Sequence, residues 1–370
     1  MMTAEVHSTD RMDSQLILVE GLPGSGKSST AQFISDQYRR DGQSCRWWHE
    51  EEKPHPLATP RGPSGAKSSA RYRRDQLIRW RDFASRESGH TVVVESKFLQ
   101  NAISQLLRVG VSRKRIVTDI HKVADFCKPM TPSLLYVHQP DYASALRRIC
   151  DERGEEIESE YVRENEACAY AKQQGLQGFD GLVQFWLDVR SIMEQLVDEL
   201  DLPGLNIDNS QQKWDQYEQQ IGEFLSLPTQ RHQLSAEDLS AYTGVYTYKA
   251  NRAPRRVAGQ TRLDNELRVR GQDFTRRVGG RMRQATRYYL DDVEFSIRLE
   301  GTELVMHDHG WLWPTSRLVP KNKAVFHIAS WPFEMEFKKD PSGNVVSATR
   351  TNPTGRWLVT GQRYDRVNDV

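Results

Sequence analysis

The 370-residue chain predicts an α/β domain with a parallel sheet and helices on both faces, followed by an antiparallel β-barrel or sandwich. Its length exceeds what one ordinary hydrophobic core needs, so two domains are expected. Strand-like apolar runs alternate with helical patterns at first, and short alternating segments broken by Gly, Asn and Pro replace them later. We therefore expect a polar tail over residues 1–14, the α/β domain over 15–228 and the β domain over 235–370.

The first elements surround a glycine-rich loop. Residues Gly21–Ser28 read Gly-Leu-Pro-Gly-Ser-Gly-Lys-Ser, which fits the pattern G-x-x-x-x-G-K-[ST]. A buried-strand run at 16–20 precedes the loop, and 29–40 has the periodicity of an amphipathic helix. This is the strand and helix context of a phosphate-binding loop, so the sequence predicts an α/β P-loop NTPase domain.

The loop predicts binding of ATP and Mg²⁺. Its glycines allow backbone N–H groups to wrap a polyphosphate, Lys27 reaches the β- and γ-phosphates, and the Ser28 hydroxyl binds Mg²⁺. The residues expected to bind the nucleotide are Gly21, Gly24, Ser25, Gly26, Lys27, Ser28 and Ser29. Lys27 is also expected to be catalytic.

The rest of the first domain continues the alternation of strands and helices. The expected strands are 45–49, 91–95, 133–138 and 205–207, and the expected helices are 71–87, 141–153, about 155–175, about 180–200 and one ending near 225. Residues 57–70 are rich in Pro, Gly, Ser and Ala, which predicts a mobile connection.

Glutamates lie at the end of one of these strands and directly after another. Glu95 ends the third strand, and we expect it to hold Mg²⁺ with Ser28 or to polarise an attacking hydroxyl; a helix-capping carboxylate is the alternative. Glu50, Glu51 and Glu52 follow the second strand. We expect Glu51 or Glu52 to act as general base toward the acceptor, against the alternative of a solvated charge run.

Arginines near the fourth strand are candidates for charge neutralisation. Arg147, Arg148 and Arg153 lie on the helix that follows it, and one or more are expected to stabilise the transferring phosphoryl group. Surface ion pairs with neighbouring carboxylates are the alternative. A second basic helix predicts either a binding surface for an anionic acceptor or an ordinary basic surface, and it carries Arg71, Arg73, Arg74 and Arg79.

The β domain opens at Leu239–Tyr246, which resembles the start of the small lipocalin-like domains appended to many bacterial hydrolases. Its expected strands are 246–248, 267–269, 295–299, 303–306, 325–328 and 335–337. Four tryptophans are expected to fill its core or to line a barrel mouth: Trp311, Trp313, Trp331 and Trp357. His307 and His309 lack an evident third ligand, so no metal site is expected there.

Hydropathy and cysteine spacing indicate where in the cell the protein is located. Mean hydropathy is −0.70, no segment approaches the roughly 18 apolar residues of a membrane span, and residues 1–14 do not resemble a signal peptide. These features are typical of a soluble cytoplasmic protein without a membrane partner. The four cysteines are widely spaced, which predicts reduced thiols.

Charge is distributed unevenly along the chain. Residues 229–370 hold 23 Lys and Arg against 16 Asp and Glu, and Lys249–Arg287 alone holds twelve against three. This basic stretch predicts a solvated outer face, a surface for RNA or another polyanion, or a contact with the acidic N-terminal domain.

Residues 15–225 resemble a group of bacterial P-loop proteins similar to thymidylate and deoxynucleoside kinases. The resemblance rests on the glycine-rich loop, Glu50–Pro56, Val94–Asn101 and Leu134–Val137. It implies that the carboxylate after the second strand, Glu51 or Glu52, faces the acceptor. Thymidylate kinases carry Asp-Arg where this chain has Glu95-Ser96, which argues against thymidylate as the acceptor.

These features together predict a Mg²⁺- and ATP-dependent kinase. Its expected acceptor is a small hydroxyl or phosphate compound, such as a nucleoside or an antibiotic-like molecule. One alternative is a polynucleotide or tRNA kinase whose basic β domain binds RNA. Another is a nucleotide-dependent switch or binding protein that makes no phosphorylated product.

Overall fold

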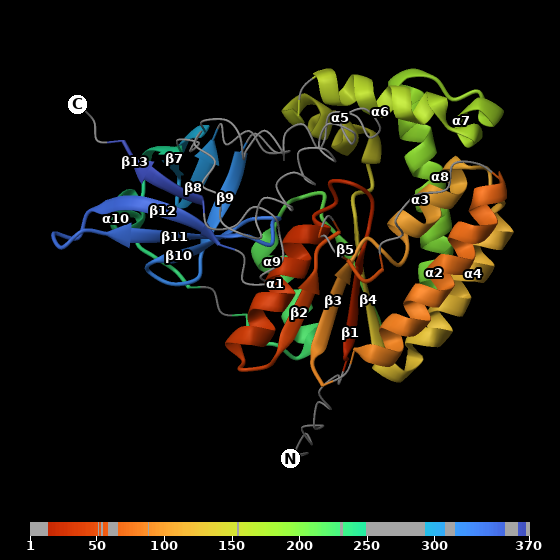
Figure 1. Ribbon diagram of the computed structural model, residues 1–370, viewed down its shortest axis with the longest axis horizontal. Coiled ribbons are helices and arrows are strands. Elements are labelled where there is room, and N and C mark those ends of the chain that lie inside the picture. The colour runs from red at the N-terminus through yellow and green to blue at the C-terminus, as the bar shows by residue number, and fades with distance from the viewer. Residues whose placement is uncertain are drawn as a thin grey trace, which may run out of the picture. The chain divides into compact units, whose positions relative to one another are not determined.

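The computed structural model describes residues 14–50, 52, 55–57, 66–87, 89–153, 155–229, 232–248, 293–307, 315–351 and 362–367 (Figure 1). The described chain forms two compact units. The first contains the residues up to Asp141 and those from Trp186 to 229. The second contains Tyr142–Phe185 and the residues from 232 onward.

A five-stranded parallel sheet organises the first unit, in the order β2-β3-β1-β4-β5. Its strands are β1 (Leu16–Glu20), β2 (Cys45–Trp48), β3 (Thr91–Glu95), β4 (Pro132–His138) and β5 (Gly204–Asp208). Leu18 of the central strand lies opposite Val94 and Leu134. All five strands therefore end at one edge of the sheet, where β1 leads into the glycine-rich loop.

Helices cover both faces of this sheet, as the sequence predicted. The helices α1 (Lys27–Arg40) and α9 (Trp214–Leu225) pack with Ile17, Val19 and Val93 on one face. The other face is covered by α2 (Ala66–Arg86), α3 (Gln100–Arg108), α4 (Arg113–Cys127) and the end of α8 (Gly178–Glu199) (Figure 1). Burial on both faces accounts for the almost continuous apolar sequence of β1 and β3.

The helices α3 and α4 were not predicted from the sequence. In α3, the buried Ala102, Ile103, Leu106 and Leu107 repeat at helical spacing. A short 3₁₀ helix, η1 (Lys128–Met130), follows α4 and leads into β4.

Three helices open the second unit: α5 (Tyr142–Arg153), α6 (Glu155–Ala167) and α7 (Ala169–Gln174). The single helix expected over about 155–175 is thus two helices. They are separated at Cys168, which has an extended backbone and accepts a hydrogen bond on Sγ from the Ala171 N–H at 3.4 Å. This is the conformation of an N-cap residue, so a new helix begins there.

Eight antiparallel strands close into a barrel, which confirms the second predicted architecture. They are β6 (Gly244–Tyr248), β7 (Val293–Glu300), β8 (Glu303–His307), β9 (Thr315–Pro320), β10 (Val325–Ile328), β11 (Glu334–Lys339), β12 (Val345–Thr351) and β13 (Gln362–Arg366), preceded by the short helix α10 (Ala236–Ser240). The strands β9, β12 and β13 were not predicted. The strand expected at 267–269 lies outside the described residues.

Aromatic side chains fill the barrel. Tyr242 contacts Phe326 and Phe337 at ring-centroid distances of 4.8 and 5.0 Å, and the Tyr246 hydroxyl donates to the Tyr242 carbonyl at 2.8 Å. Trp331 packs against this core, whereas the other three tryptophans expected there lie outside the described residues. The interior is thus packed in the manner of a small closed barrel.

Two further predictions concern the cysteines and the presence of membrane-spanning helices. All four cysteines are free thiols, as predicted. Among the described helices, none has both the length and the apolarity needed to cross a bilayer.

Candidate functional site

The glycine-rich loop is closed so tightly that two of its positions exclude a side chain. Gly21 has φ of +154°, and a Cβ there would lie 2.1 Å from the Val137 carbonyl oxygen. Gly26 has φ of +104°, and its Cβ would lie 2.7 Å from both the Asn209 amide nitrogen and the Trp214 ring. These contacts give a physical reason for the glycines of the motif.

Polar groups of this loop are arranged to receive an anion. The helix α1 starts directly behind Gly26, which has no side chain to cap the first N–H groups. The Lys27 ammonium donates to the Leu22 carbonyl at 2.8 Å inside the loop. The Ser25 hydroxyl is buried and has no hydrogen-bond partner within the described part of the chain. An uncapped helix N-terminus, a buried cation and an orphaned hydroxyl together fit the oxygens of a phosphate.

Residues directly after β4 and β5 hold the loop in place. The Asn209 side chain donates to the Ser25 carbonyl at 2.7 Å, and its backbone N–H donates to the His138 carbonyl at 2.8 Å. Gln139 donates to the Gly24 carbonyl at 3.4 Å. Asn209 and Gln139 were not among the predicted site residues. Their position directly after strands was the available signal, because ligand sites of parallel sheets lie at the carboxyl ends of the strands.

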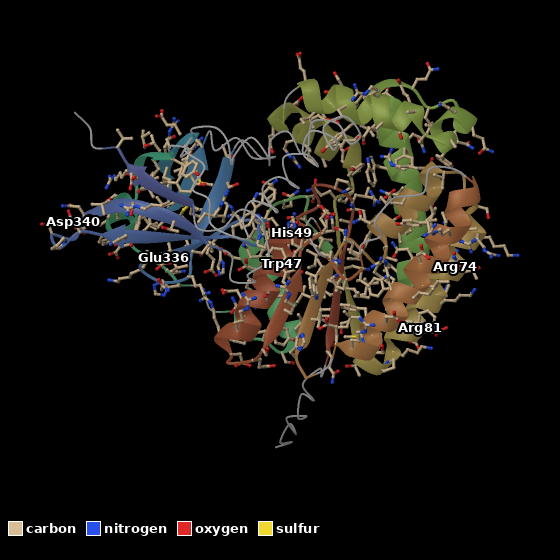
Figure 2. The ribbon with its side chains drawn as sticks, in the orientation of Figure 1. Trp47, His49, Arg74, Arg81, Glu336 and Asp340 are labelled. Carbon is tan, nitrogen blue, oxygen red and sulfur yellow. The ribbon has the colours of Figure 1, made fainter. Side chains whose placement is uncertain are left out.

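Glu95 is the central carboxylate of the site. It ends β3, is fully buried, and accepts hydrogen bonds from the Ser28 hydroxyl and the Trp47 indole, both at 2.9 Å. His49 Nε2 lies 3.7 Å from its Oε1. Figure 2 shows Trp47 and His49 at the edge of the sheet where its strands end. Burial raises the pKa of Glu95, and the charge on Glu50 raises it further, although His49 and Lys27 act in the opposite direction.

The Ser28–Glu95 contact brings together the two residues predicted to bind Mg²⁺. Their oxygens form a pair of the hard ligands that this cation prefers. Within the described part of the chain, no three His, Cys, Asp or Glu side chains gather into a metal site. A cation held by Ser28 and Glu95 would therefore take its remaining ligands from phosphate and water, as is usual for Mg²⁺.

The carboxylates after β2 differ in environment. Glu52 is buried and paired with the Arg46 guanidinium. Burial disfavours the charge on Glu50, but nearby Lys27, Lys97 and His49 outweigh it and lower the pKa of Glu50. Glu51 lies outside the described residues. The charge on Glu50 thus interacts with both Lys27 and Glu95.

The candidate arginines of α5 belong to the second unit. Arg147 donates to both carboxylate oxygens of Glu158 at 2.8 and 2.9 Å, and its guanidinium lies 3.5 Å from the Phe179 ring centroid. Arg148 is exposed, and the side chain of Arg153 is not among the described atoms. The contacts of Arg147 are those of an ion pair on its own unit.

The basic residues of α2 make mostly local contacts. Arg73 binds both carboxylate oxygens of Asp119, and Arg79 donates to the Pro56 carbonyl at 3.4 Å. Arg71 and Arg74 lie within 4.0 Å of Asp75. These contacts fit the alternative of a basic helix surface. The basic stretch Lys249–Arg287 and His309 lie outside the described residues.

No family model matches this chain, and no curated protein matches it. The likeness to nucleotide kinases therefore rests on the sequence motifs of the loop and the strand ends.

Glu20 is a buried carboxylate of the site that the sequence analysis did not single out. It ends β1, is fully buried, and accepts the backbone N–H groups of Phe98 and Gln100 at 2.8 and 2.9 Å. It thereby caps the start of α3. Burial raises the pKa of Glu20 from 4.5 to about 7, against the lowering effect of these hydrogen bonds and of Lys27.

We expect Glu20 to make stability depend on pH. Its pKa is higher in the folded than in the unfolded chain, so the folded state binds more protons between about pH 4.5 and 7. The free energy of unfolding should therefore fall as pH rises through this window, by on the order of 3 kcal/mol from this group. Urea unfolding of the wild type and Glu20→Gln at pH 5 and pH 7.5 measures the difference. If the free energy of unfolding changed with pH by the same amount in both proteins, Glu20 would not be the source of the pH dependence.

Proposed function

We propose that the protein is a Mg²⁺- and ATP-dependent phosphotransferase acting on a small acceptor. One observation carries the proposal: the Gly21–Ser28 loop encloses the Lys27 ammonium, and its last residue is hydrogen-bonded to the buried Glu95. A cradle for phosphate and an oxygen pair for a divalent cation thus lie side by side. This is the minimum arrangement that phosphoryl transfer requires.

Each group has a defined task in this proposal. The N–H groups at the start of α1 bind the phosphates, and the Lys27 ammonium exchanges the Leu22 carbonyl for β- and γ-phosphate oxygens. Ser28 and Glu95 would hold Mg²⁺, which neutralises phosphate charge when bound. Asn209 and Gln139 keep the loop in its binding conformation through the Ser25 and Gly24 carbonyls.

The transfer step follows from these positions. An acceptor oxygen forms a bond to the γ-phosphorus while the bond from that phosphorus to the β,γ-bridging oxygen breaks, and ADP leaves. A hydroxyl acceptor gives its proton to a carboxylate, whereas a phosphate acceptor needs no base. Glu50 and the predicted Glu51 are the candidates for this base, because the lowered pKa of Glu50 keeps it ionised and Glu52 is already paired with Arg46. Arg147, Arg148 and Arg153 remain candidates for charge neutralisation, and we expect the reaction to take place in the cytoplasm.

A label-transfer experiment tests the function. The full chain is incubated with γ-labelled ATP, Mg²⁺ and mixtures of nucleosides, nucleotides, sugar phosphates and antibiotic-like hydroxyl compounds, and in a separate reaction with RNA. We expect one class of small molecule to acquire the label. ATP binding with slow hydrolysis and no labelled product would instead indicate a nucleotide-dependent switch, and label on RNA would indicate a polynucleotide kinase.

A further inference from the structure

Two buried N–H groups have no hydrogen-bond partner among the residues that the structure describes. They are the indole Nε1 of Trp48, at the end of β2, and the imidazole Nε2 of His55. The two rings contact each other, with centroids 5.4 Å apart. Trp48 is 8% exposed and His55 is 5% exposed. Buried donors normally find an acceptor, so two neighbouring exceptions call for a physical reason.

The unpaired ring nitrogen of His55 is a hydrogen-bond donor. Its Nδ1 accepts the Leu57 backbone N–H at 3.1 Å, which leaves the proton of the neutral ring on Nε2. Burial lowers the pKa of His55 to about 2, together with the charges of Lys97, His49 and Arg46, so the ring is neutral at physiological pH. An indole nitrogen only donates. Both unpaired groups are thus hydrogen-bond donors, and a bound ligand would supply the acceptor atom.

Cations flank this pair of donors. The Arg46 guanidinium lies 4.1 Å from the Trp48 ring centroid and is fixed there by Glu52. The Lys97 ammonium is near enough to influence both His55 and Glu50. Arg46 and Lys97 are themselves partly exposed to solvent. A ligand group placed here would meet N–H donors and positive charge, which is the chemistry of oxyanion binding.

We propose that Trp48 and His55, flanked by Arg46 and Lys97, form a subsite for an oxyanion carried by the acceptor. The oxyanion is a phosphate monoester or a carboxylate that is held at a distance from the transferred phosphoryl group. This inference rests on the proposed function and narrows it, because it makes the acceptor an anionic small molecule rather than a neutral nucleoside or a cationic antibiotic.

The two donors can be observed directly by NMR. Full-length ¹⁵N-labelled protein carrying Lys27→Ala, which weakens phosphate binding at the loop, is titrated with inorganic phosphate or acetate at constant ionic strength. The Trp48 indole and His55 ring signals are assigned with Trp48→Phe and His55→Phe, which keep an aromatic ring in place. We expect both signals to shift along one saturation curve. Stronger binding of phosphate would point to a phosphomonoester acceptor, and stronger binding of acetate to a carboxylate.

Substitution of one donor supplies the second measurement. Losing one hydrogen bond to a charged group should weaken oxyanion binding about tenfold in Trp48→Phe. Trp80→Phe is the matched control, because Trp80 is a core residue that contacts Phe83 and Phe98. The affinity of this variant for the oxyanion should be unchanged. The wild type is titrated in parallel, and the subsite is overturned if neither signal moves in Lys27→Ala, or if both signals move in the wild type but not in Lys27→Ala. ATP binding to the wild type is measured separately, so that failure of the subsite is distinguishable from failure of the proposed function.

Discussion

Lys27→Ala should abolish phosphoryl transfer and leave the fold intact. The substitution removes the ammonium that the loop encloses, and with it the charge that meets the developing negative charge on the γ-phosphoryl oxygens. We expect kcat to fall by at least about a thousandfold, at the upper end of what a preorganised electrostatic group supplies. Turnover of the acceptor found by label transfer is the measurement.

Two controls keep this result interpretable. Lys114→Ala removes an exposed lysine of α4 and should leave turnover unchanged. Urea unfolding should show that Lys27→Ala remains cooperatively folded, because the side chain contributes to the loop rather than to an apolar cluster of the sheet. If Lys27→Ala turned over the acceptor at the wild-type rate, the glycine-rich loop would not be the active site.

The sequence predicted those parts of the fold that depend on local pattern. Strands that are buried on both faces are almost wholly apolar, so β1 and β3 were recognisable, and the change to short alternating segments indicated the barrel. The loop was recognisable because its glycines occupy backbone conformations and close contacts that other residues do not tolerate. In these cases the physical constraint acts on consecutive residues.

The remaining features of the site depend on contacts between distant residues. The Asn209 side chain donates to the carbonyl of Ser25, which lies 184 residues earlier in the chain. Glu20 caps a helix that begins 80 residues after it. No local pattern marks either residue. Three consecutive glutamates likewise give no sign of which one faces Lys27. That choice depends on the backbone after β2 and on Arg46, which engages Glu52.

Glu95→Gln should lower kcat by at least about a hundredfold with little change in stability. Glutamine keeps the shape of the side chain and can replace both hydrogen bonds. Its carbonyl oxygen accepts from the Trp47 indole, and its amide donates to the Ser28 hydroxyl, which can also accept. Only the negative charge is lost. Since burial already raises the pKa of Glu95, removing that charge carries no stability penalty of its own.

The dependence on Mg²⁺ separates a catalytic from a structural role of Glu95. If its charge anchors the cation, Glu95→Gln should need more Mg²⁺ for half-maximal rate as well as having a lower kcat. Trp47→Phe is the matched control, because it removes one hydrogen bond to the carboxylate and retains the charge. It should lose no more than about tenfold in kcat, the scale of one hydrogen bond to a charged group. If the two variants lost activity equally and had the same Mg²⁺ requirement, Glu95 would only position its neighbours, and the cation would have to bind elsewhere.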